Sequence, residues 1–178
     1  MLGLEEIEIL NRLSDFKDAM SQIPSSVSVV GAFANDLQSE IVAATISSLV
    51  SVSVNPESEE VLFALKNKSF LGNHLLDSPL FSISVLNNRQ HEVAYFFGSR
   101  TSALQPQEGL VEKIWNRSGN FPYINEASVV LLCKIREKIE RSHSTIYFAS
   151  VIEFFCDDIQ KPLVYFDRKF NSIYEPPG

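Results

Sequence analysis

The sequence predicts a mainly β domain, an antiparallel β-barrel with small flanking α-helices. Most apolar segments are short and rich in β-branched residues, which favour strands over helices. These segments do not alternate regularly with helical ones, so a parallel Rossmann sheet is not expected. The 178 residues, of which 45% are hydrophobic and 21% charged, fit one folded domain that needs no disulfide or metal for stability.

The first part of the chain predicts two short helices and then strands. Apolar residues three apart predict an N-terminal helix over residues 1–13. Ser14 is a suitable N-cap for a second helix over 16–23, where the main domain, expected over 14–174, begins. Residues 25–34 alternate as a strand does. Residues 40–54 contain few helix formers, so they predict one long strand or a strand with a break.

The middle of the chain predicts two strands and two helices: strands over 61–66 and 80–87, and helices over 70–77 and 91–97. Alternation places Phe81, Ile83 and Val85 on one face of the second strand. Ser69 is the expected N-cap of the first helix. Gly98 suits a left-handed C-cap for the second helix.

The last third predicts an irregular stretch followed by strands over 127–139, 144–155 and 162–170. The irregular stretch, residues 99–120, is long enough to suggest a functional segment. Trp115 within it would either cover a ligand pocket or pack in the core, and the sequence does not choose between these roles. Residues 175–178 are expected to form a frayed tail.

Charge and cysteine content exclude several classes of function. With 15 basic and 22 acidic residues the net charge is −7, which does not suit binding to nucleic acid. The two cysteines, Cys133 and Cys156, do not have the spacing of metal ligands, and the three histidines do not either. No metal site is therefore expected. Both cysteines are expected as buried thiols within strands of a cytoplasmic protein. No signal peptide is expected from the N-terminal residues, and no apolar run is long enough to span a membrane.

Two segments could bind a ligand. Small residues and hydroxyls in the strand around Thr45, Ser47 and Ser48 would let a planar group lie close to the backbone and would offer hydrogen bonds. Spacing alone, however, favours an ordinary strand with serines facing water. Lys66 and Ser69 would bring positive charge and helix amides to an anion, although a solvated turn is the simpler interpretation of that segment alone.

Seven segments in order carry a family resemblance that runs from about residue 14 to 174. They are FKDAMSQIPSSVSVVGAFAND, VAATISSLVSVSVNP, LKNKS, LFSISVLNNRQHEVAYFFGS, FPYINEASVVLLCKI, STIYFASVIEFF and PLVYFDRKF. Together they resemble the flavin reductase-like, FMN-binding split-barrel family, and in particular the small reductase component of two-component flavin-dependent monooxygenases. The resemblance implies a six-stranded split barrel that forms a homodimer, with the flavin at the subunit interface.

The resemblance also implies a role for each site residue. Ring contacts would come from Ala43, Ala44 and Thr45, and contacts to the ribityl-phosphate arm from Ser47 and Ser48. The phosphate would be held by Lys66 and Ser69. Phe96 and Phe97 would lie near the phosphate or on the adenine side. The nicotinamide side would be lined by Ser144, Tyr165 and Arg168. No acid–base residue is expected, because the cofactors carry out hydride transfer and the protein aligns them.

The implied activity is that of an NAD(P)H:flavin oxidoreductase, which uses FMN or FAD and supplies reduced flavin to a monooxygenase. No cluster of arginines suggests a reader of a 2′-phosphate, which favours NADH over NADPH. Four residues depart from the family pattern: Ala43 replaces a glycine, Val50 a threonine, and Phe96 and Ser144 each a histidine. These departures leave two alternatives open, a flavin-binding protein without efficient reductase activity and a structural dimer that binds no flavin.

Overall fold

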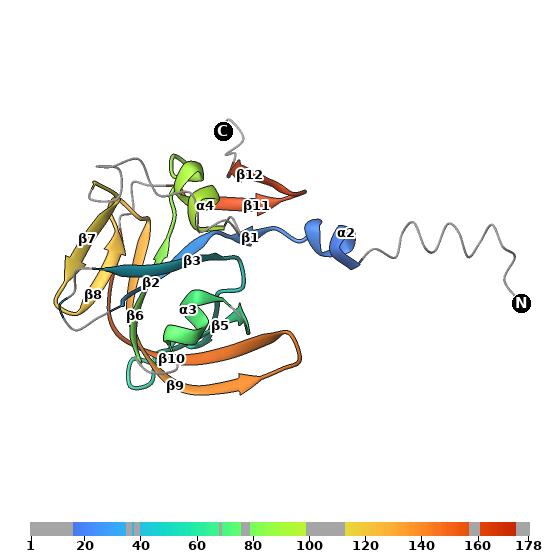
Figure 1. Ribbon diagram of the computed structural model, residues 1–178. Helices are drawn as coiled ribbons and strands as arrows, with labels where there is room; N and C mark the ends of the chain where they lie inside the picture. Colours follow the sequence, from blue (N-terminus) through green and yellow to red (C-terminus); the bar gives the residue numbers. More distant parts are fainter. Residues whose placement is uncertain are drawn as a thin grey trace, which may run out of the picture.

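The computed structural model describes residues 16–34, 37, 40–67, 69–75, 79–98, 113–156 and 161–173. The helix predicted over residues 1–13, the tail over 175–178 and residues 99–112 of the irregular stretch lie outside this described part. The described elements are, in chain order, α2 (Phe16–Ser21), β1 (Ser25–Ser26), β2 (Ser28–Phe33), β3 (Ile41–Ile46), β4 (Val50–Ser53), β5 (Glu60–Lys66), α3 (Phe70–His74), β6 (Leu80–Val85), α4 (His91–Gly98), β7 (Trp115–Ser118), β8 (Phe121–Ile124), β9 (Val129–Glu140), β10 (Ser144–Cys156), β11 (Leu163–Phe166) and β12 (Lys169–Ser172) (Figure 1).

A curved antiparallel sheet of seven strands in the order β3-β2-β6-β9-β10-β5-β4 forms the body of the domain (Figure 1). The predicted β-barrel with flanking helices is confirmed, but the expected count of six strands is wrong for this sheet. Residues 40–54 break after Ile46 and give two strands, β3 and β4, at opposite ends of the sheet order. Separate small sheets, β1-β11-β12 and β7-β8, lie against the body.

The concave side of the sheet holds the main hydrophobic core. Phe63 of β5 lies between two other buried rings, with ring centroids 5.3 Å from Phe81 and 5.2 Å from Tyr147. Helix α3 lies within the curve of the sheet, and its Leu71 is buried in this core (Figure 1). The predicted N-cap is confirmed, because the Ser69 hydroxyl accepts a hydrogen bond of 3.0 Å from the Gly72 N–H.

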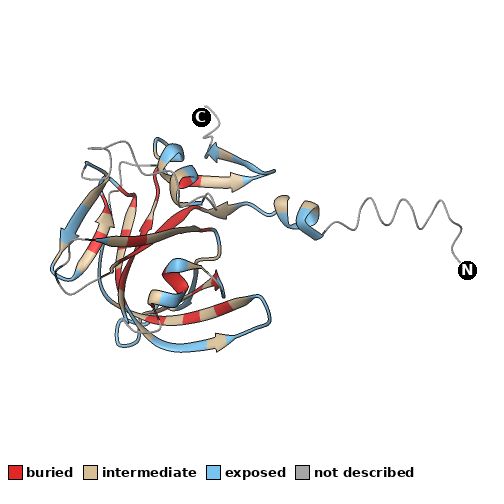
Figure 2. Cartoon of the chain, viewed as in Figure 1, coloured by how far each residue is buried: buried red, intermediate tan, exposed pale blue. Residues whose placement is uncertain are grey.

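A second core covers the outer face of β2, β6 and β9. Buried residues run continuously along β2, because its two faces meet different cores (Figure 2). Helix α4 and β11 pack on this outer face, and the β7–β8 hairpin also lies there. Gly31 makes room for the hairpin, since a Cβ atom at that position would lie 2.7 Å from the Trp115 ring. Ser84 of β6 accepts a hydrogen bond of 3.0 Å from the Ile124 N–H and holds the hairpin to the sheet. Trp115 therefore packs in a core.

Two predictions about the strands are wrong. Part of the stretch expected to be irregular forms the β7–β8 hairpin, whose turn contains Gly119 with a φ of 54°. The single strand predicted over 162–170 is also a hairpin, because Asp167 and Arg168 take φ values of 49° and 60° and reverse the chain. Two consecutive residues with positive φ are typical of a type I′ turn.

Smaller predictions about single residues also fail. Gly98 is the last residue of α4 but does not adopt a left-handed conformation; among the described glycines only Gly119 has a positive φ. Cys133 is buried as expected, whereas Cys156 is exposed at the end of β10. Burial raises the pKa of the Cys133 thiol to about 12, and it also raises the pKa of Tyr147. Both groups lie in the main core. No helix of the described part could cross a membrane.

Candidate functional site

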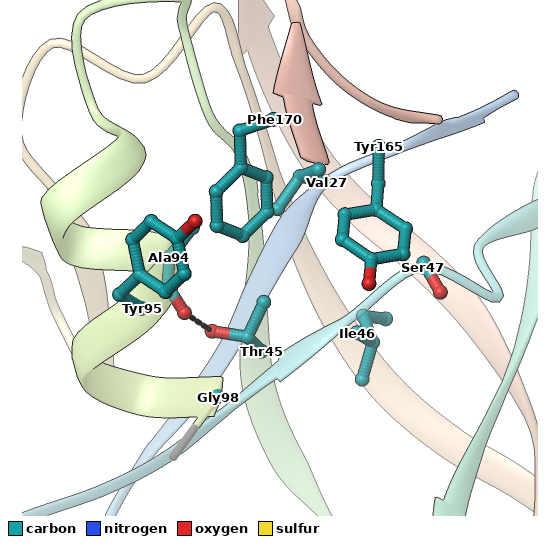
Figure 3. A pocket seen from close by; sticks show the side chains of 9 residues that line it. All are labelled: Val27, Thr45, Ile46, Ser47, Ala94, Tyr95, Gly98, Tyr165 and Phe170. Carbon is teal, nitrogen blue, oxygen red and sulfur yellow. Dashed lines mark hydrogen bonds between the residues drawn. The ribbon is translucent and has the colours of Figure 1, made fainter. Parts of the chain in front are cut away.

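A pocket of about 320 Å³ lies where three elements meet: the end of β3, helix α4 and the β11–β12 hairpin (Figure 3). It is lined by Val27, Thr45, Ile46, Ser47, Ala94, Tyr95, Gly98, Tyr165 and Phe170. This volume is at the small end of the range of about 300–1,000 Å³ for small-molecule sites. The pocket therefore suits one ring system better than a whole dinucleotide.

One wall of the pocket is the last part of β3 and the segment that follows it. Thr45 donates a hydrogen bond of 2.9 Å to the carbonyl oxygen of Ala94 on α4, and Figure 3 shows this bond at the edge of the pocket. Ser47 is exposed and makes no hydrogen bond to another described residue in the structure. Its hydroxyl is therefore available to a ligand.

The opposite wall is aromatic. Phe170 of β12 packs edge-on against two tyrosines, with ring centroids 4.6 Å from Tyr95 and 5.4 Å from Tyr165. The Tyr165 hydroxyl points toward the Ile46–Ser47 segment of the other wall (Figure 3). Aromatic faces and edges offer favourable packing to a flat conjugated ring.

The lining of the pocket determines which part of a ligand it can hold. None of the nine lining residues has a charged side chain, and the polar side-chain atoms are hydroxyl oxygens. Such a lining fits a neutral planar ring with a few polar edges. A phosphate group needs positive charge or several N–H donors, so it would lie outside this pocket.

Three of the residues predicted for the site meet in this pocket: Thr45, Ser47 and Tyr165. The alanines before Thr45 alternate, so that Ala43 packs against the outer core and Ala44 against the main core. They do not line the pocket, and the alternation of β3 prevents both from contacting the same ring.

Phe96 and Phe97 do not line the pocket. Their rings are 4.8 Å apart between centroids, and Phe97 packs at 5.5 Å against Trp115. Helical spacing explains this arrangement, because Ala94 and Gly98 are four residues apart and share the face that meets β3. The same spacing is the signal by which Tyr95, three residues before Gly98, could have been found from the sequence.

The phosphate-binding residues predicted from the resemblance lie outside the pocket. The Ser48 hydroxyl accepts a hydrogen bond of 3.0 Å from the Ala64 N–H and donates one of 3.3 Å to the Ala64 carbonyl. The Ser69 hydroxyl caps α3, as described above, and Lys66 is exposed at the end of β5. Ser48 and Ser69 thus both have structural roles in this fold, of which the sequence predicted only the N-cap of Ser69.

The residues predicted for the nicotinamide side are not brought together. Ser144 is the direct partner of Lys66 in the β5–β10 ladder, while Tyr165 lines the pocket. Arg168 does not lie on a strand, contrary to the prediction, because it occupies the β11–β12 turn. Its guanidinium forms a salt bridge with Asp18 of α2, and 56% of its side chain is exposed. Phe170, which the prediction did not include, occupies the pocket instead.

Comparison with known proteins gives a consistent result. A family model described as Flavin reductase like domain matches residues 20–174. The reductase component of an FADH(2)-dependent resorcinol hydroxylase from Rhizobium sp. is 26% identical over 179 residues, covering 100% of this chain and 96% of that protein. An NADH:riboflavin 5′-phosphate oxidoreductase from Streptomyces pristinaespiralis is 28% identical over 158 residues, covering 88% of this chain and 86% of that protein.

A solved structure has a similar fold. The styrene monooxygenase flavin reductase from Pseudomonas putida superposes with a TM-score of 0.80 at 18% sequence identity, and the match covers 92% of this chain and 100% of that one. At this level of identity the likeness concerns the fold alone.

Proposed function

This chain belongs to the flavin reductase-like domain family, and from that premise we propose that it is an NAD(P)H:flavin oxidoreductase that binds the flavin ring in the pocket between β3, α4 and the β11–β12 hairpin. The observation that carries the proposal is the uncharged lining of this pocket, with hydroxyls on one wall and three aromatic rings on the other. The family match supports treating residues 14–174 as a single domain.

The side chains of the pocket fit the ring system of a flavin. When bound, a flavin accepts a hydride from reduced nicotinamide, and this chemistry belongs to the two cofactors. Ser47 and the Tyr165 hydroxyl would donate or accept hydrogen bonds at the polar edge of the ring. Tyr95 and Phe170 would cover an apolar face and exclude water, so the protein contributes alignment rather than acid–base catalysis.

The cofactor arms would extend over the surface beyond this pocket. Lys66 offers an exposed positive charge near the N-terminal end of α3, and we keep it as the proposed phosphate contact. The alternatives FMN and FAD both remain within the proposal. We favour NADH as the donor, since the relatives of this chain include an enzyme named NADH:riboflavin 5′-phosphate oxidoreductase.

We further propose two partners. The first is a monooxygenase that receives the reduced flavin, as expected from similarity to a resorcinol hydroxylase reductase component. The second is another copy of this chain. Strand β4 is the last strand in the sheet order and exposes Val50 and Val52, followed by Val54, which is 82% exposed. An apolar edge of this kind favours association, and sedimentation analysis would test for a homodimer.

We place the protein in the cytoplasm, where NADH is produced.

The experiment that tests the proposed function is steady-state oxidation of NADH and NADPH by the purified protein with FMN, FAD or no added flavin. We expect turnover that requires flavin and saturates with its concentration. Absence of turnover with every flavin and both nucleotides, in protein shown to be folded by circular dichroism, would contradict the reductase assignment.

A flavin-binding protein without efficient reductase activity is the second candidate. The observation in its favour is the position of Ser144, which the family resemblance aligns with a histidine and which lies outside the pocket. His143, one residue earlier, is exposed in the turn between β9 and β10 and does not line the pocket either. Fluorescence titration would separate the two functions, because flavin binding without NADH oxidation is expected only for the second.

A further inference from the structure

The hydroxyl of Thr45 is already engaged within the protein. Its hydrogen is donated to the Ala94 carbonyl at 2.9 Å, which joins the end of β3 to the middle of α4. A hydroxyl has one hydrogen to donate, so Thr45 cannot also donate one to a ligand while this bond exists. Sequence resemblance implied a ring contact for Thr45, but the geometry points to a different role.

Helix α4 depends on such contacts for its position. It has eight residues, of which Ala94 alone is buried, and an isolated helix of this length is marginal in water. Two neighbouring residues attach it on two sides of the pocket. Ala94 accepts the bond from Thr45, and Tyr95 packs edge-on against Phe170 of the hairpin at 4.6 Å.

The residues that make these contacts also line the pocket. Thr45, Ala94 and Gly98 form the corner where β3 meets α4, and a Cβ atom on Gly98 would lie 3.6 Å from the Thr45 Cβ. A shift of α4 relative to β3 would therefore change the width of the pocket and move Tyr95. The affinity of the pocket for a planar ring depends on how closely its walls fit that ring, so a change in width should change the Kd.

We propose that Thr45 is a positioning residue, whose hydrogen bond to the Ala94 carbonyl sets the spacing between β3 and α4 and thereby the affinity of the pocket for the flavin ring. This inference rests on the proposed function. It assigns Thr45 an indirect effect on flavin binding, through the position of α4, rather than direct contact with the flavin by its hydroxyl.

The test compares Thr45→Val, which keeps the shape and removes the hydroxyl, with Thr45→Ser, which keeps the hydroxyl. We expect Thr45→Val to raise the Kd for FMN and the KM for flavin about three- to tenfold, the range that loss of one ordinary hydrogen bond allows. The kcat should change less than about twofold, because a looser pocket weakens ground-state and transition-state binding equally. Thr45→Ser should stay within about twofold of the wild type.

Ser82→Ala is the matched control. Ser82 of β6 is buried, donates a hydrogen bond to the Pro122 carbonyl of the hairpin, and does not line the pocket. Its loss should lower the urea midpoint without changing the Kd for FMN. An equal effect of Ser82→Ala and Thr45→Val on the Kd would show that the change reflects general destabilisation, and it would overturn the inference.

Hydrogen exchange of the α4 amides provides a readout that needs no flavin. We expect faster exchange over residues 91–98 in Thr45→Val than in the wild type or Thr45→Ser. Unchanged exchange would overturn the positioning role even if the wild type proved to be a reductase. If the wild type binds no flavin and Thr45→Val still exchanges faster, both the proposed function and the link between Thr45 and flavin affinity are refuted. If the enzyme is active and Thr45→Val leaves the Kd for FMN unchanged, only the inference about Thr45 is refuted.

Discussion

Replacing Ser48 with alanine should destabilise the fold and leave flavin affinity unchanged. The β4–β5 ladder begins at the pair Val50–Leu62, so Ala64 has no partner residue on β4. The Ser48 hydroxyl takes that place, with bonds of 3.0 Å from the Ala64 N–H and 3.3 Å to its carbonyl. The side chain of Ser48 thus supplies the hydrogen bonds to Ala64 that a β4 residue would otherwise make.

The size of the effect follows from the two lost bonds. Removing the hydroxyl leaves a half-buried Ala64 N–H without its partner, and an unsatisfied backbone group of this kind costs about 1–3 kcal/mol. For a domain of this length, each kcal/mol lowers the Tm by about 2–4 °C. We therefore expect Ser48→Ala to reduce the free energy of unfolding by about 2 kcal/mol and the Tm by about 4–8 °C.

The neighbouring serine provides the matched control. Ser47 is exposed, lines the pocket and makes no hydrogen bond to another described residue, so Ser47→Ala should change the free energy of unfolding by less than about 0.5 kcal/mol. It should raise the Kd for FMN about threefold by removing a polar contact to the ring. Urea unfolding and fluorescence titration of FMN, carried out on both variants, measure the two effects separately. If Ser48→Ala instead keeps its stability and loses flavin affinity, Ser48 is a ligand contact and our account of the β3–β4 break is incorrect.

Three further predictions concern residues outside the pocket. Gly31→Ala should cost about 1–3 kcal/mol, because its Cβ would lie 2.7 Å from the ring of Trp115, and the fluorescence of this single tryptophan should shift as well. Burial raises the pKa of the Cys133 thiol from an ordinary 9.0 to about 12, so between these pH values the thiol ionises only in the unfolded chain. The stability that this group contributes is therefore complete below pH 9 and falls by at most about 1.4 kcal/mol per pH unit up to pH 12. Urea midpoints should show this slope for the wild type and should lack it for Cys133→Ala. Arg168→Ala removes the exposed salt bridge to Asp18 and should change the free energy of unfolding by no more than about 1 kcal/mol. The KM for NADH should change by less than twofold. A tenfold rise in that KM would show that Arg168 does contact the nicotinamide nucleotide.

Much of the fold could be predicted because local chemistry and tertiary packing agree in most elements. Ser69 caps α3 as its type predicts, and Phe81 and Ile83 share the core face of β6 as alternation requires. The C-terminal hairpin was missed because its turn residues, Asp167 and Arg168, both have positive φ, a conformation for which glycine or asparagine is the usual signal. The β7–β8 hairpin did carry such a signal, Gly119-Asn120 at its turn, within a stretch that appeared irregular.

The site was predictable to the level of segments rather than side chains. The strand around Thr45 and the C-terminal segment around Tyr165 do enclose the pocket. Sequence spacing could not show that the hydroxyls of Thr45 and Ser48 are bound to the backbone of α4 and β5, because those partners are 49 and 16 residues away along the chain. A motif identifies which segments meet, whereas the bonds between segments decide which hydroxyls remain available to a ligand.

A crystal structure of the protein with FMN would test the central claim most directly. We predict that the flavin ring lies between Ser47 and the aromatic residues Tyr95, Tyr165 and Phe170, with its phosphate outside the uncharged pocket and toward solvent. A flavin ring bound elsewhere, for example over Lys66 and Ser144 at the β5–β10 end of the sheet, with the pocket empty, would contradict the assignment of this pocket.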